Sequence, residues 1–133
     1  KPPKNHIKIN VDAFFIAGTG LAALGAVGRD CFGDIVFSAG CRFHGCSDAE
    51  EAEVQALSFG LNQARKLNLN KVQMETGCNA VVAAVNDCNV SRGSWWACYE
   101  NSKDMIKDFG DYSVSKFHRE SNVAAHELLP MLE

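Results

Sequence analysis

The sequence has 133 residues, 47% of them hydrophobic, with a net charge of −3 and a pI near 5.8. This length predicts one domain over residues 1–133, with residues 1–6 expected to be flexible, and is too short for two domains. The mild acidity excludes a strongly basic protein that coats nucleic acid nonspecifically, but not a metal-dependent nuclease, whose carboxylates lower the net charge. No apolar run approaches the roughly 20 residues that a membrane helix needs, so we expect no membrane partner.

The six cysteines are irregularly spaced, and no apolar segment typical of an export signal precedes them. We therefore expect reduced thiols in an intracellular protein, nuclear or cytoplasmic, rather than the disulfides of a secreted one. The stretch CRFHGC brings Cys41, His44 and Cys46 together, which would suit a zinc site. No second pair of ligands follows at zinc-site spacing, so we favour buried thiols over a metal site here.

The first third of the chain predicts three strands. Apolar and polar residues alternate strictly over residues 7–12, which indicates a strand with one apolar face that ends at Asp12. Residues 21–40 predict two more strands, joined by a turn over residues 30–33 in which Gly33 can take a positive φ. These three strands should form an antiparallel meander.

The middle of the chain predicts a helix, a strand and a second helix. Residues 47–69 have helical periodicity, with Ser47 or Asp48 as the N-cap and acidic residues in the first turn. Residues 71–76 alternate like a half-buried strand, and from Ala80 the apolar residues recur at helical spacing. The junction between these two elements contains Gly77.

The last third predicts a helix over residues 95–110, with Gly110 as its stop, a strand over residues 112–118 and a helix over residues 121–133. The resulting order is β-β-β-α-β-α-α-β-α. A meander followed by alternating helices and strands predicts an α/β domain with a mixed five-stranded sheet and helices on its faces.

Glu53 is the most informative charged residue, because it lies in the middle of the apolar stripe of the first predicted helix. A carboxylate at that position faces inward, and an unpaired buried charge is costly. Two interpretations stay open: a salt bridge to a buried lysine or arginine, and a metal ligand or general base. The stripe consists of Ala49, Ala56, Leu57, Gly60 and Ala64.

Two other candidates are less distinctive by themselves. Asp12, at the expected strand end, is in phase with Lys8 and Asn10, and an exposed aspartate at a strand end is common. His126 lies on the last predicted helix beside Val123, where a semi-buried histidine without catalytic function is more usual.

Together these residues carry a resemblance to a known family. The segments INVDA, RDCFG, EAEVQAL and VQMETGCNAVV resemble, in this order, the motifs of the ribonuclease H fold. The closing RESNVAAHEL resembles the Arg-Glu-x-Asn-x-x-Ala-His pattern of the plant reverse-transcriptase-like branch, as found in plant retroelements. The resemblance spans nearly the whole chain.

The resemblance implies a site that cuts the RNA strand of an RNA–DNA hybrid with two Mg²⁺ or Mn²⁺ ions. Asp12 matches the first-strand aspartate of the family and Glu53 its helix glutamate, and both would be metal ligands. Gly77 stands where the family has a third aspartate, and His126 stands where the bacterial enzymes have a fourth. Glu75 has the strand parity to face the same way as position 77, but it lies further back along the strand.

The sequence therefore leaves two hypotheses open. The first is a ribonuclease H-type nuclease domain, weakened or inactive because the third aspartate is missing. The second is a non-catalytic module that keeps the fold and binds nucleic acid or a protein partner. In either case Lys8, Lys116 and Arg119 are candidate contacts to the phosphates of a hybrid. Trp95 and Trp96 are candidates for packing on the sheet or for stacking on a base.

Overall fold

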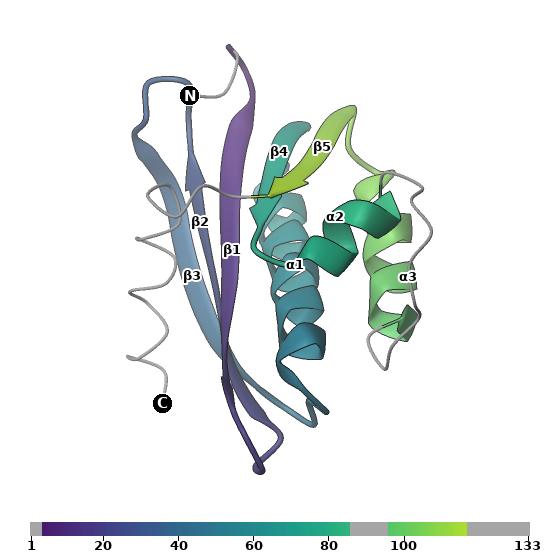
Figure 1. Cartoon of the computed structure of the whole chain (residues 1–133). Coiled ribbons are helices and arrows are strands. Elements are labelled where there is room, and N and C mark those ends of the chain that lie inside the picture. The colour runs from purple at the N-terminus through teal and green to yellow at the C-terminus, as the bar shows by residue number, and fades with distance from the viewer. Residues whose placement is uncertain (1–3, 86–95, 117–133) are drawn as a thin grey trace.

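A mixed five-stranded sheet forms the centre of the structure, a computed structural model that describes residues 4–85 and 96–116 (Figure 1). The predicted order of elements is confirmed as far as the last strand, and the predicted last helix lies outside the described residues. The elements are β1 (Ile7–Ile16), β2 (Leu21–Arg29), β3 (Ile35–His44), α1 (Ala49–Lys66), β4 (Lys71–Thr76), α2 (Asn79–Val85), α3 (Trp96–Ile106) and β5 (Asp111–Lys116).

The strands lie in the order β3-β2-β1-β4-β5, so β1 is central. The pairs β1–β2 and β2–β3 are antiparallel, as the predicted meander requires. The pairs β1–β4 and β4–β5 are parallel, and each needs a crossover, which α1 supplies before β4 and which α2 and α3 supply before β5. Figure 1 shows α1 and α3 beside one another on the same side of the sheet.

β1 is longer than its sequence pattern predicts. We expected it to end at Asp12, but its antiparallel pairing with β2 continues to Ile16. The parallel pairing with β4 is shorter and stops at Asn10, opposite Glu75. Asp12 therefore lies inside β1, immediately beyond the end of the parallel ladder. That prediction was wrong because the alternation of side chains does not reveal which neighbouring strand stops first.

The start of α1 has a capping box. Asp48 is the N-cap, and its carboxylate accepts a hydrogen bond of 2.8 Å from the backbone N–H of Glu51. The Glu51 carboxylate in turn accepts a 2.7 Å bond from the N–H of Ser47. These two bonds satisfy backbone donors that the helix itself cannot pair. They fix the first turn of α1, from which the next turn projects Glu53.

The end of α3 differs from the prediction. The helix stops at Ile106, four residues before the glycine that we expected to end it. The backbone N–H of Gly110 instead binds the backbone oxygen of Asn70 at 2.8 Å and its side-chain oxygen at 2.9 Å. A side chain at position 110 would collide with Asn70, so this glycine joins two loops rather than capping a helix.

The core lies between α1 and the central strands. Ile9 and Val11 of β1 and Met74 of β4 are fully buried against α1. The helix approaches them closely at Gly60, where an added Cβ would lie 2.5 Å from Val11 Cγ1 and 3.2 Å from Met74 Cε. Gly60 therefore sets how near α1 comes to β1. None of the helices that the structure describes is long and apolar enough to cross a membrane.

We expect Gly60→Ala to destabilise the fold by about 1–2 kcal/mol. Alanine improves helix propensity by about 1 kcal/mol, but an added methyl group in a packed core costs about 1–3 kcal/mol. Val11 is β-branched and buried, so it cannot move aside. Urea unfolding would measure the change. In a Val11→Ala background the same substitution should cost less, and an equal cost in both backgrounds would contradict the proposed contact.

Candidate active site

Asp12 and Glu53 meet at one backbone amide. The N–H of Ala13 donates to Asp12 Oδ1 at 2.9 Å and to Glu53 Oε1 at 3.2 Å. Asp12 comes from the central strand and Glu53 from the second turn of α1, 41 positions further along the chain. Two carboxylates that share one donor lie close enough for their charges to repel each other.

The packing of α1 on β1 brings these two groups together. Glu53 precedes Gly60 by seven residues, which is close to two helical turns, so both lie on the same face of α1. Gly60 contacts Val11, and Glu53 contacts Ala13, so α1 runs back along β1 in the opposite direction. The close approach at Gly60 therefore holds Glu53 against β1.

The Glu53 carboxyl is strongly perturbed. Burial raises its pKa, the charge of Asp12 and a hydrogen bond with Asp12 raise it further, and the Ala13 N–H opposes them, so that the pKa is about 8. Its Oε2 atom is buried and has no hydrogen-bond donor among the described residues. The sequence left two interpretations open for Glu53: a salt bridge, and a metal ligand or general base. Among the described residues no lysine or arginine pairs with Glu53, so the salt bridge is not found there.

The two carboxylates offer oxygen ligands of the kind that a hard divalent cation prefers. Such a cation would relieve the repulsion between the two carboxylates and supply a partner for Glu53 Oε2. The protein nevertheless provides few ligands. Across residues 4–85 and 96–116, no group of three or more His, Cys, Asp or Glu side chains could hold a metal ion. Asp12 and Glu53 alone form an incomplete site.

Gly77 lies beside this pair. The parallel register of β1 and β4 ends with Asn10 opposite Glu75, and two positions further along the chain come Asp12 in β1 and Gly77, which follows the end of β4. The next residue, Cys78, is buried, and its burial is the main cause that raises the pKa of its thiol, with the charges of Glu50 and Glu53 adding to it. The junction after β4 is therefore close to the Glu53 side of α1. We predict that a side chain at position 77 would face the two carboxylates.

Glu75 is occupied elsewhere. Its Oε1 accepts a 2.9 Å hydrogen bond from the side-chain amide of Asn10, and its Oε2 lies 3.4 Å from Lys8 Nζ. Asn10 and Lys8 precede Asp12 on the same face of β1, so both partners draw this carboxylate away from Asp12. The arrangement is buried, since Asn10 is 1% and Glu75 is 8% exposed. Glu75 therefore does not replace the missing third acid.

The predicted nucleic-acid contacts lie in different surroundings. Lys8 is the partner of Glu75, and its side chain is only 21% exposed. Lys116 is exposed at the end of β5, opposite Thr76, and so lies near the Gly77 junction. Arg119 and His126 lie outside the described residues, as does the side chain of Trp96.

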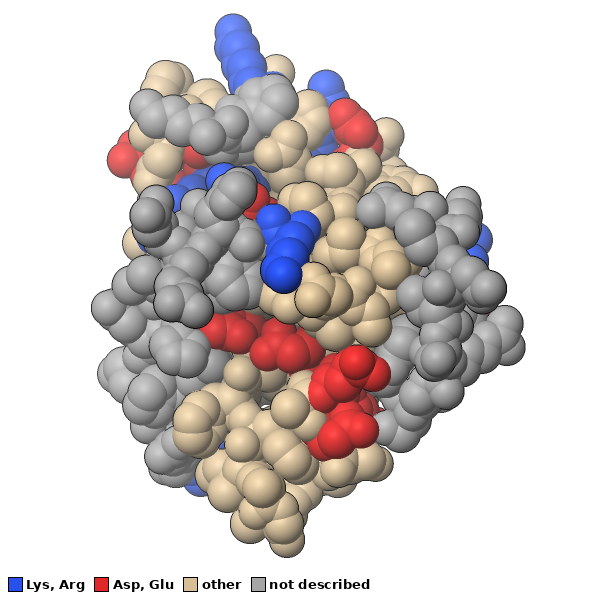
Figure 2. All heavy atoms as spheres, in the orientation of Figure 1, with Lys and Arg blue, Asp and Glu red and all other residues tan. Residues whose placement is uncertain are grey.

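One face of the molecule carries a band of acidic side chains. Figure 2 shows acidic side chains gathered in a band across the middle of one face, with a basic side chain beside them. An acidic band repels the phosphates of a nucleic acid unless a cation lies between them. The charge distribution on this face is thus compatible with metal-assisted binding of a polyanion.

Comparison with known proteins identifies the family. The model of the reverse transcriptase-like family matches residues 10–131, which is nearly all of the chain. This chain belongs to the reverse transcriptase-like family. No curated protein sequence is similar enough to count as a match.

Solved structures show that this reverse transcriptase-like domain has the fold of ribonuclease H domains. RNase H1 of Halobacterium salinarum has a TM-score of 0.84 at 20% identity, over 94% of this chain and 95% of that one. The N-terminal RNase H domain of a Mycobacterium tuberculosis protein has a TM-score of 0.82 at 19% identity, over 96% and 98%. The LC11 RNase H1 from compost, solved with an RNA/DNA hybrid, has a TM-score of 0.82 at 18% identity, over 95% of both chains. The predicted ribonuclease H-like fold is confirmed.

Three groups of this reverse transcriptase-like domain were not foreseen from its sequence. They are the Ala13 N–H that joins the two carboxylates, and the Lys8 and Asn10 side chains that bind Glu75. Nearly every residue has a backbone N–H group, so the sequence does not show which of them will donate to a side chain. Asn10 and Lys8 could have been suspected, because they alternate in phase with Asp12 and would be costly to bury without a polar partner.

We expect the stability of the metal-free domain to fall as the pH rises from 4.5 to about 8. In this range the unfolded chain has released the Glu53 proton, which ionises near 4.5, while the folded domain keeps it up to about 8. The loss of folding stability is absent below pH 4.5, complete above about pH 8 and on the order of 5 kcal/mol. Urea unfolding in EDTA at several pH values would measure it.

Glu53→Gln should remove most of this pH dependence, since the amide carries no charge. Glu50→Gln, at an exposed glutamate one turn earlier, is the matched control and should leave it in place. A Glu53→Gln variant with the same pH dependence as the parent would show that another group causes it.

Proposed function

We propose that this domain binds RNA–DNA hybrids and is a ribonuclease H-type nuclease whose cleavage is weakened by Gly77. The observation that carries the proposal is the pair of carboxylates, Asp12 and Glu53, held on one backbone amide. The LC11 RNase H1, which has the same fold, is solved with an RNA/DNA hybrid, and this supports the substrate class.

Asp12 and Glu53 would hold a divalent cation, Mg²⁺ or Mn²⁺. When bound, such a cation activates a water molecule for attack on a phosphate and stabilises the leaving oxygen. The chain contributes the geometry. The Ala13 N–H fixes one oxygen of each carboxylate, and the buried Oε2 of Glu53 remains available as a ligand. Without a cation, burial keeps Glu53 largely protonated at neutral pH, so the empty pair is not strongly repulsive.

Gly77 limits this chemistry. Affinity for hard cations follows the number and charge of the oxygen ligands, and a site with two acids in place of three binds Mg²⁺ less tightly. Hydrolysis with two metal ions also needs carboxylates that hold both ions 3.5–4 Å apart. With Glu75 bound to Lys8 and Asn10, no other acid of β4 compensates for the missing one.

The second candidate function is a non-catalytic module that keeps the fold and binds nucleic acid or a protein. The contacts of Glu75 favour this second function. Its carboxylate could have bound a metal ion, but it is paired with Asn10 and Lys8 within the sheet instead. Under this alternative the Asp12–Glu53 pair remains as part of a binding surface. The two functions differ in what a restored third acid would do.

We expect Gly77→Asp to increase Mg²⁺- or Mn²⁺-dependent cleavage of an RNA–DNA hybrid at least about tenfold. A third charged ligand contributes about 1.5–3 kcal/mol, and each 1.4 kcal/mol corresponds to a factor of ten. A labelled hybrid would report cleavage, and titration calorimetry would report metal affinity. Gly77→Asn has nearly the same shape without the charge and should restore neither property.

Two outcomes would contradict the proposal. A folded Gly77→Asp protein that neither binds the metal nor cleaves the hybrid would favour the non-catalytic module. Full activity of the unchanged chain would show that two acids are sufficient. In the Gly77→Asp background, Asp12→Asn should abolish the gain, since it removes a ligand from the same site.

Binding of the hybrid should weaken steeply with salt, because it depends on phosphate contacts. Lys116→Gln should reduce the slope of log affinity against log salt by about 1 if this exposed lysine contacts a phosphate. Lys8→Gln should leave the slope unchanged and lower the free energy of unfolding by about 1–3 kcal/mol, since Glu75 loses its charged partner. Filter binding at several salt concentrations and urea unfolding would measure both. The reverse pattern would make Lys8 the phosphate contact.

A further inference from the structure

β3 forms one edge of the sheet. It is ten residues long, from Ile35 to His44, and it pairs with β2 on one side (Figure 1). Among the described residues, no backbone-to-backbone hydrogen bond links its outer side to another segment. None of its residues is buried, whereas all residues of β2 except the first and last are buried. β3 therefore presents a row of backbone donors and acceptors with which another strand can pair.

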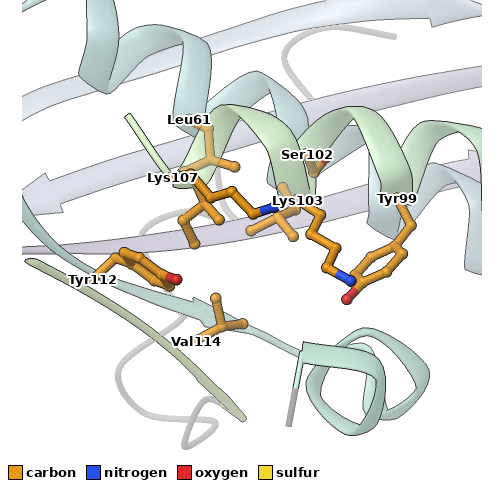
Figure 3. Close-up of a pocket in the computed structure, with 9 residues that line it drawn as sticks. Leu61, Tyr99, Ser102, Lys103, Lys107, Tyr112 and Val114 are labelled. Atoms are coloured by element: carbon orange, nitrogen blue, oxygen red, sulfur yellow. The ribbon is translucent and has the colours of Figure 1, made fainter. Parts of the chain in front are cut away.

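Proteins usually protect an exposed edge strand by keeping it short or by placing charges or prolines on it. β5, at the opposite edge, has six residues and a charge at each end, at Asp111 and Lys116. Figure 3 shows its Tyr112 and Val114 side chains facing α3. β3 is longer, has no lysine, proline or acidic residue, and carries its one formal charge at Arg42. Of the two edges, β3 is the one open to a partner strand.

Exposed apolar side chains gather at the start of the same edge. Phe32, in the turn before β3, is 77% exposed, Ile35 is 58% exposed and Val36 is 45% exposed. These three are half of the six large hydrophobic side chains that are exposed in the described part of the chain. Such a grouping is typical of a surface that another protein covers.

We propose that β3 pairs, antiparallel, with β3 of a second copy of this chain. The two strands are related by a two-fold axis that passes through the sheet beside Gly40. Such an axis keeps the same faces of both sheets together, so residues of one face lie opposite residues of that same face. The ladder of β3 with β2 is regular from Phe37 to His44, and the new pairing uses this regular part.

The side chains favour an axis at Gly40 over its neighbours. With this axis Phe37 lies opposite the second copy's Phe43, which gives an aromatic pair at each end of the new ladder. Both phenylalanines lie at the partly buried positions of β3, so the pairs extend the apolar side of the sheet from one copy to the other. An axis at Cys41 would leave Phe37 without an opposite residue.

The charge on this edge does not oppose the pairing. Arg42 lies opposite the second copy's Ser38, and the two arginines are four positions apart along the ladder. That is about 14 Å, longer than the Debye length of about 8 Å at physiological salt, so their repulsion is mostly screened. The pairing uses neither Asp12 nor Glu53, so it is independent of the proposed function.

Sedimentation velocity of the full chain, from roughly 5 µM to roughly 500 µM, tests the pairing. Fewer than ten residues of each copy take part, against about 20–30 in a standard interface, so the dimer should be weak, with a Kd on the order of 100 µM. Most chains should therefore sediment as a monomer at the lowest concentration and as a dimer at the highest.

Substitutions of the exposed Ser38 test the register. Ser38→Glu places a carboxylate opposite the second copy's Arg42 and should tighten the dimer about fivefold, and Ser38→Lys should weaken it about fivefold. Net charge alone predicts the reverse order, because glutamate adds to the net charge of −3 and lysine reduces it. Ser113→Glu and Ser113→Lys, at an exposed serine of β5, are the matched controls and should change the Kd less than about twofold.

Three results would overturn the proposal. The first is a chain that stays monomeric up to roughly 500 µM, five times the expected Kd, which would leave this edge to another partner. The second is a dimer whose Kd the two Ser38 variants do not change, which would place the contact on another surface. The third is an equal effect of the Ser38 and Ser113 variants, which would show that the charge acts without a defined register.

Discussion

The contact between α1 and β1 at Gly60 is the constraint on which the site depends. A helix packed on a sheet is normally held off by its side chains, and here the missing Cβ lets Val11 and Met74 touch the backbone of α1. Two turns earlier, the same face of the helix carries Glu53 to the backbone of β1 at Ala13. A helix further from the sheet would leave the Ala13 amide to Asp12 alone. The close contact of α1 with β1 therefore determines both the packing of the core and the geometry of the site.

That contact also explains the unusual ionisation of the site. Glu53 is forced beside Asp12 in a poorly solvated position, and its pKa is about 8 as a result. The folded domain is less stable whenever this carboxylate is ionised and no cation is bound. Glu75, by contrast, is buried with a lysine and an asparagine as partners. The domain therefore contains one buried carboxylate, Glu75 of β4, whose two oxygens both have partners, and one, Glu53 of α1, whose Oε2 has none among the described residues. It is Glu53 that shares a donor with Asp12.

Most of the fold could be predicted from the sequence, because alternation in strands and periodicity in helices are properties of local segments. The meander, the capped first helix and the crossover to β4 follow from such patterns. The end of β1 could not be predicted, because it depends on two partners that stop at different residues. In the site, Asp12 and Glu53 could be named as candidates, but their shared amide and the engagement of Glu75 arise only when distant segments meet.

The missing side chain at position 77 changes the charge of the site as well as its ligand count. Glu53 is largely protonated at neutral pH, so it adds little negative charge to the metal-free pair, whereas an aspartate at position 77 would add a charge. A phosphate backbone is repelled less when that charge is absent, so a hybrid would approach this site with less help from a cation. Under the proposed function, a glycine at position 77 weakens metal-dependent cleavage and makes binding without metal easier. On that proposal, the charge of a single side chain separates a nuclease from a binding module.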